Sequence, residues 1–96
     1  VFPDCAVPLV FPAEDAAYVH GRDGFGDTGY LAPTGVAQAE HAALAMIRYS
    51  HSPLGLLLVC LGPLTNLALA LRLDPTLPSR IGRLVVMGGA VTGQGN

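Results

Sequence analysis

A continuous apolar run over residues 55–61 constrains the fold of this chain more than any other feature. It has no polar alternation, which is typical of a parallel strand covered on both faces. Gly62-Pro63 interrupts the run, and proline suits the first position of a helix because its φ is already helical. Apolar residues then recur at helical spacing up to residue 73. The sequence therefore predicts a strand, a tight turn and a helix that ends at Asp74-Pro75.

A second strand and an earlier helix flank this unit. Residues 83–87 form another apolar run, and a strand–helix–strand connection of this length joins neighbouring parallel strands. Residues 34–50 are predicted to form a helix, with Thr34 as its N-cap and His41 on its surface. Its apolar stripe consists of Val36, Ala39, Ala43, Met46 and Ile47. The predicted fold class is α/β, a parallel sheet with flanking helices.

The turns that follow the two predicted strands lie at the same edge of the sheet, because parallel strands end on one side. Ligands bind at this carboxyl edge in open α/β sheets. The placement makes Thr65, Asn66, Met87 and Asn96 candidate site residues. The alternative is that Thr65 and Asn66 only satisfy free backbone N–H groups at the start of the helix.

The segment before residue 34 is read as loop, with two local exceptions. Residues 1–2 or 7–11 are candidates for a short edge strand, and residues 13–18 for one helical turn. At residues 20–27, three glycines in six residues indicate positive φ or a close approach to another group. No strand precedes them, which excludes a phosphate-binding glycine loop. A solvated turn remains the other interpretation.

Composition narrows the class of protein. Only 12% of the residues are charged, against an average of about 25% in soluble domains, and 51% are hydrophobic. We therefore expect residues 1–96 to be an incomplete domain, with a processed small protein as the alternative. The five arginines are dispersed and the net charge is −2, which argues against a nucleic-acid or membrane partner. Cys5 and Cys60 form no disulfide framework, so we expect a reducing, cytoplasmic location.

Three separated stretches together resemble one family, the inosine–uridine-preferring nucleoside hydrolases. Residues 20–27 resemble its His-Gly-x-Asp-Gly-Leu-Gly segment. Residues 61–68 resemble its Gly-Pro-Leu-Thr-Asn-Leu-Ala segment, and residues 85–96 resemble its Met-Gly-Gly-Ala…Gly-Asn segment. Their order and spacing match, and the resemblance covers nearly the whole chain. It implies part of a Rossmann-like parallel sheet with flanking helices.

The resemblance also implies an activity and a set of roles. It implies a calcium-dependent N-ribohydrolase, usually oligomeric, that splits nucleosides into ribose and free base. By motif position, the backbone carbonyl of Thr65 would bind calcium and Asn96 would hydrogen-bond the ribose. Met87 would pack against the sugar, and His20 would lie on the side of the base. The residues do not distinguish purine from pyrimidine substrates.

The chain lacks the segments that supply most of the catalytic and calcium-binding residues of the family. The amino-terminal Asp-Thr-Asp-Pro-Gly-x-Asp-Asp run and the late His-Asp are absent, and Asp4-Cys5 stands where a glycine is common. Calcium takes six to eight oxygen ligands. We therefore expect this chain alone to be inactive and the activity to belong to a longer product. The alternatives are a non-catalytic truncated product that binds a partner and a small nucleotide-binding module.

Overall fold

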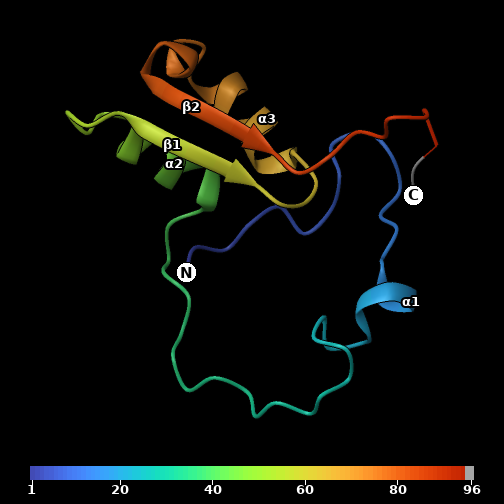
Figure 1. The fold of residues 1–96 in the computed structure, drawn as a ribbon. Coiled ribbons are helices and arrows are strands. Elements are labelled where there is room, and N and C mark those ends of the chain that lie inside the picture. The colour runs from blue at the N-terminus through green and yellow to red at the C-terminus, as the bar shows by residue number, and fades with distance from the viewer. Residues whose placement is uncertain (95–96) are drawn as a thin grey trace.

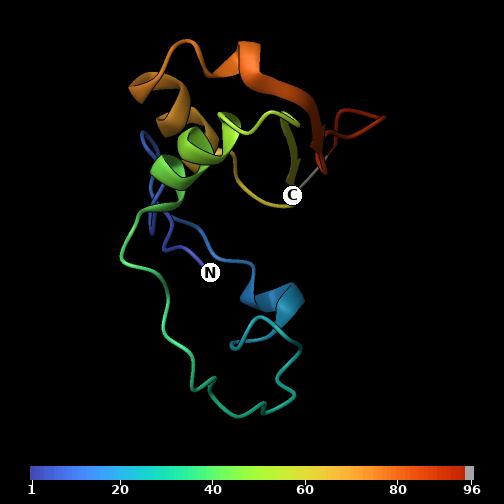
Figure 2. The same ribbon diagram turned by 90° about the vertical axis from the view of Figure 1, so that its left-hand side faces the viewer.

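The computed structural model describes residues 1–94 and contains one small parallel sheet with two helices packed on it (Figure 1). Figure 2 shows both helices on the same side of the two strands. The blue-to-green segment between the first residues and the second helix loops away from this unit in both views. The elements are α1 (Ala17–His20), α2 (Ala42–Ser50), β1 (Leu56–Cys60), α3 (Thr65–Leu73), the 3₁₀ helix η1 (Leu77–Arg80) and β2 (Ile81–Val86).

The strand–helix–strand unit is confirmed. β1 pairs with β2 in parallel, with Leu58 opposite Leu84 and Val59 opposite Val85. The strands fall within one or two residues of the predicted ranges, and α3 ends at Asp74 as expected. Helix α3 begins at Thr65 with Leu64 in the N-cap position, so the prediction that Pro63 is its first helical residue is wrong, and Pro63 lies in the turn before the helix.

The prediction that both faces of β1 are covered is wrong for the described residues. Exposure alternates along the strand, with Leu57 63% and Val59 52% exposed, while Leu56, Leu58 and Cys60 are half-buried. Helices α2 and α3 pack on one face only (Figure 2). The run is therefore apolar on both faces of the strand, but the described helices cover only one of these faces.

The predicted helix over residues 34–50 forms only in its second half. Helix α2 begins after His41, whose backbone is extended at φ −69° and ψ 143°. Thr34 is not its N-cap, and Val36 from the predicted stripe is 93% exposed. The physical reason is packing, since an amphipathic helix gains most of its stability from a covered apolar face. The residues before His41 have no such surface beneath them.

The other amino-terminal predictions have mixed outcomes. Residues 1–11 form no strand in the described part of the chain. The predicted helical turn over residues 13–18 is shifted to α1, Ala17–His20. Two backbone hydrogen bonds attach the first residues to the start of α2 and to the segment before it. Gln38 N–H donates to the Val1 carbonyl at 2.8 Å, and Ala42 N–H donates to the Pro3 carbonyl at 2.7 Å.

The core lies where α2, α3 and η1 meet. Leu77, in η1, is fully buried, and it is the largest side chain with that degree of burial. The core cluster consists of Ala43, Leu67, Ala70 and Leu77. Two alanines let α2 and α3 approach closely, because small side chains at the contact shorten the distance between helix axes. The cluster therefore contains two leucines, of which only Leu77 is completely buried.

A polar network closes the other end of this core. Arg80 Nε donates to Ser50 Oγ at 2.9 Å, and Arg80 Nη1 donates to Thr76 Oγ1 at 2.7 Å. The guanidinium also forms an ion pair with Asp74. The Thr76 hydroxyl donates to Asp74 Oδ1 at 2.6 Å. The network joins the end of α2 to the connection between α3 and β2.

This network predicts an acid-sensitive contribution to stability. The Thr76 hydroxyl, assisted by the Thr76 N–H and Arg80, lowers the pKa of Asp74. A carboxyl whose pKa is lowered on folding stabilises the protein above its ordinary pKa of about 3.9, and this contribution is lost as the pH falls through the lowered value. We expect Asp74→Asn to flatten the loss of urea resistance between pH 6 and the acid range. Asp4→Asn, at an exposed carboxyl, is the control. Equal slopes for both variants would contradict this role.

Candidate functional site

The carboxyl ends of the two strands lie side by side, as predicted. Met87 N–H donates to the Cys60 carbonyl at 2.8 Å, which extends the ladder one residue beyond β2. A pocket of about 170 Å³ lies beside the end of β1 and the Gly62-Pro63 turn. Asn66 and Leu67 from α3 and Met46 from α2 also line it. The start of α3 and the end of β1 therefore border one small cavity.

Asn66 does not cap its own helix. Its Oδ1 accepts a hydrogen bond from the Cys5 N–H at 2.8 Å, and the N-cap of α3 makes no side-chain hydrogen bond. The interpretation that Thr65 and Asn66 only satisfy N–H groups at the helix start is therefore wrong for the described chain. Asn66 instead attaches the amino-terminal segment to the edge of the sheet.

Cys5 is a member of this edge that the sequence did not reveal. Its Sγ lies 3.8 Å from Nε2 of His41, and its N–H is held by Asn66. The contact spans 36 residues to His41 and 61 to Asn66, so no local pattern marks it. The departure at Asp4-Cys5 from the expected glycine was the only available signal.

Met87 lies at the predicted edge, and its side chain is largely exposed. The backbone turns directly after it, with Gly89 at φ +79°. Asn96, the other candidate in this stretch, lies outside the described residues.

His20 is the last residue of α1, and hydrogen bonds to side chains within residues 21–27 close the loop that follows it. Asp23 Oδ1 accepts from the N–H groups of Phe25 and Asp27, at 2.8 and 2.9 Å. These bonds to the charged carboxylate, the one from Phe25 first, lower the pKa of Asp23. The His20 carbonyl accepts from Gly26 N–H at 2.7 Å. The loop is therefore an ordered turn.

The predicted positive φ values are confirmed in this loop. Gly21, Gly24 and Gly26 all have φ between +73° and +77°, and Asp27 has φ +56°. Asp27 Oδ1 accepts from the Arg22 N–H at 2.8 Å. Asparagine and aspartate tolerate such a backbone better than other side chains do, because they form local hydrogen bonds.

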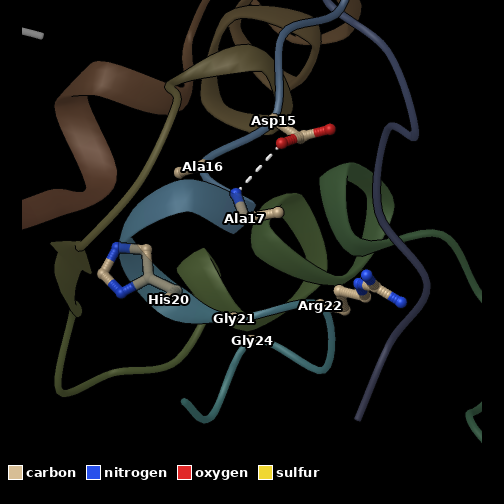
Figure 3. Close-up of a pocket in the computed structure, with 7 residues that line it drawn as sticks. All are labelled: Asp15, Ala16, Ala17, His20, Gly21, Arg22 and Gly24. Atoms are coloured by element: carbon tan, nitrogen blue, oxygen red, sulfur yellow. Dashed lines mark hydrogen bonds between the residues drawn. The ribbon is translucent and has the colours of Figure 1, made fainter. Parts of the chain in front are cut away.

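A shallow pocket of about 480 Å³ lies between α1 and the loop (Figure 3). Figure 3 shows Asp15 bound to the Ala17 N–H, with the His20 ring and the Arg22 guanidinium well apart. Figures 1 and 2 both place α1 away from the sheet. The structure therefore does not bring His20 to the edge formed by Asn66 and Met87.

The described residues do not fit a metal ion by themselves. No three His, Cys, Asp or Glu side chains among residues 1–94 lie together in a way that would hold one. The backbone carbonyl of Thr65 is a possible oxygen donor at the sheet edge, but calcium takes six to eight oxygens.

Among the described helices, none is both long and apolar enough to cross a membrane.

Comparison with known proteins identifies the family. The family model described as "Inosine-uridine preferring nucleoside hydrolase" matches residues 1–96. Probable uridine nucleosidase 2 of Oryza sativa subsp. japonica is 41% identical over 83 residues, which cover 84% of this chain and 25% of the relative. The inosine-uridine preferring nucleoside hydrolase of Leishmania major is 36% identical over 88 residues, covering 88% and 28%.

A solved structure agrees with these relatives. That of an inosine-guanosine nucleoside hydrolase superposes with a TM-score of 0.82 at 37% identity, covering 99% of this chain and 33% of that one. The chain thus spans a quarter to a third of the length of the proteins it matches. The α/β fold class and the resemblance of the three motifs are both confirmed. The chain belongs to the inosine-uridine preferring nucleoside hydrolase family.

Proposed function

We propose that residues 1–96 form the middle part of a domain that hydrolyses the N-glycosidic bond of ribonucleosides. The family match over the full chain is the observation that carries this proposal. In the reaction, the bond from C1′ of the ribose to the base nitrogen breaks and the oxygen of water bonds to C1′. The base leaves with a proton. The barrier lies in an oxocarbenium-like state, as in other glycoside hydrolyses.

The sheet edge supports a role in binding the sugar. Met87 is exposed directly after β2, next to the end of β1, where a ribose would meet both strand ends. We propose that Met87 packs against the sugar and that Asn96 hydrogen-bonds to it. His20 is proposed to act on the side of the base. Since its loop lies apart from the sheet here, that role requires further segments of the domain to bridge the two.

Calcium belongs to the proposal only for a longer protein. The described residues offer no cluster of carboxylates. We therefore propose that the Thr65 carbonyl is one calcium ligand and that the other ligands come from parts of the protein outside this chain. The 96-residue chain alone would then be inactive. We further propose a cytoplasmic protein that is a homo-oligomer in its longer form.

A second candidate function rests on the uncovered sheet face. Leu57, Val59 and Val85 are exposed apolar residues, and Val85 lies opposite Val59 on the neighbouring strand. A non-catalytic product would cover such residues by binding a partner, because two strands with an open apolar face are marginal alone.

The discriminating experiment compares two proteins. One is the 96-residue chain, and the other adds the sequence that flanks it in its own gene. Both are incubated with inosine and with uridine, in calcium or in a chelator, and released ribose is measured by a reducing-sugar assay. We expect ribose release only from the extended protein in calcium.

Two results would overturn these assignments. A folded extended protein that releases no ribose would remove the hydrolase proposal and leave the partner-binding candidate. Ribose release by the 96-residue chain itself would show that ligands from outside this chain are not required. Circular dichroism of each sample establishes that the comparison is between folded proteins.

A further inference from the structure

The two ring nitrogens of His41 contact α2 and the amino-terminal segment, and that segment in turn contacts α3. Nδ1 accepts a hydrogen bond from the Ala43 N–H at 3.1 Å, so the ring caps helix α2. Nε2 lies 3.8 Å from Sγ of Cys5 in the amino-terminal segment. Cys5 in turn donates its N–H to Asn66 at the start of α3. One side chain therefore lies between the starts of both helices and the segment that crosses them.

The hydrogen bond to Ala43 defines the protonation state of the ring. An imidazole nitrogen accepts a hydrogen bond only when it carries no proton. Nδ1 must therefore be bare, which places the single proton of the neutral ring on Nε2, facing the Cys5 sulfur. The imidazolium form has a hydrogen on both nitrogens and cannot accept from Ala43.

Protonation would also place a charge in an unfavourable position. The start of a helix carries a partial positive charge from its free N–H groups, and a cation there is destabilising. The freed Ala43 N–H would be costly as well, because Ala43 is fully buried in the core. Its neighbour Ala42 already donates to the Pro3 carbonyl, so the amino-terminal segment is bound to the same turn.

The charged groups around the ring do not oppose this effect. The nearest carboxylate in sequence, Glu40, accepts from Arg48 at 2.6 Å, and this bond lowers the pKa of Glu40. Glu40 therefore stays ionised and paired throughout the range in which histidine titrates. From α3, the group at this junction is the uncharged Asn66 amide.

The amino-terminal segment contributes two titratable groups at this junction. Cys5 faces Nε2, and Asp4 precedes it with an exposed side chain.

We propose that His41 is a pH-sensitive cap, which holds the start of α2 and the amino-terminal segment together when neutral and releases both when protonated. The neutral ring accepts a hydrogen bond from the Ala43 N–H and the imidazolium cannot, so the cap is present while the ring is neutral. It is lost when the ring gains a proton. Release of the amino-terminal segment would also break the hydrogen bond from the Cys5 N–H to Asn66 and so alter the edge of the sheet.

The test compares His41→Asn with His41→Ala in the full chain. Asparagine is a strong N-cap that does not titrate in this range, whereas alanine cannot cap. The readout is hydrogen exchange of the Ala43 N–H at pH 7.5 and 5.5, corrected for the intrinsic pH dependence of exchange. For the unmodified chain we expect about a fivefold loss of protection at the lower pH, as for a typical cap. Asparagine should remove this pH dependence, and alanine should give low protection at both values.

Nitrogen-15 shifts of the His41 ring provide a second readout that needs no variant. We expect the Nε2–H form at pH 7.5. Nδ1–H at that pH would overturn the proposal, as would equal pH dependence in the unmodified chain and His41→Asn. If a variant fails to fold, the ring shifts and the Ala43 exchange of the unmodified chain still decide the outcome.

Discussion

Replacing Leu77 with alanine is expected to lower the free energy of unfolding by about 2–5 kcal/mol, the usual range for a buried leucine. Leu77 is 0% exposed and is one of two leucines in a cluster completed by two alanines. The neighbouring core residues belong to α2 and α3, which are packed against each other, so they cannot move far enough to fill the cavity that the substitution leaves. Such a loss is a large fraction of the 5–15 kcal/mol that stabilises a typical domain. Urea denaturation followed by circular dichroism would measure it.

Leu73→Ala is the matched control. It deletes the same atoms from the last residue of α3, where the side chain is 55% exposed. Alanine also has the higher helix propensity, so the expected change is within about 0.5 kcal/mol. Equal effects of the two substitutions would show that the cluster around Leu77 is not the core of the folded chain.

The strand–helix–strand unit could be predicted because its signals are local. An apolar run, a Gly-Pro break and a helical repeat ending at Asp74-Pro75 each lie within one element. Both strands pair in parallel with the predicted neighbours. Such patterns report which residues prefer an apolar environment and with which period. They require no knowledge of what lies across the interface.

The helix over residues 34–50 shows the limit of the same reasoning. Its apolar period runs from Val36 to Ile47 without interruption, yet only the part after His41 forms. The period describes a face that could be buried, whereas helix formation depends on a partner for that face. Leu57 in β1 shows the same limit. Its apolar side chain predicts a covered face, but the described helices do not reach that face.

The candidate site was predictable only in part for a similar reason. The shared edge of the sheet follows from topology, and the Met87–Cys60 bond confirms it. The contact of Cys5 with Asn66 joins residues 61 positions apart, which no spacing rule encodes. The roles of Met87, Thr65, His20 and Asn96 toward a nucleoside remain predictions.

Gly21→Ala is expected to break the loop that follows His20. Gly21 has φ +76° and ψ 170°, a backbone conformation essentially restricted to glycine that costs other residues about 1–3 kcal/mol. An added Cβ would also lie 2.6 Å from the Asp27 nitrogen, a backbone atom that cannot rotate away. The Asp27 carboxylate would then lose the Arg22 N–H. We expect faster hydrogen exchange at Arg22 and, in the extended hydrolase, a higher KM for nucleosides.

Gly24→Ala separates the two causes. Gly24 has a similar φ of +73°, but no atom lies within 4 Å of its added Cβ. It should therefore suffer only the conformational cost and keep the bond from Arg22 to Asp27. If both substitutions accelerate Arg22 exchange equally, the close approach of Gly21 to Asp27 does not hold the loop. If only Gly21→Ala does so and KM is unchanged, the loop is closed as described but His20 does not contact the base, because a displaced His20 would weaken nucleoside binding.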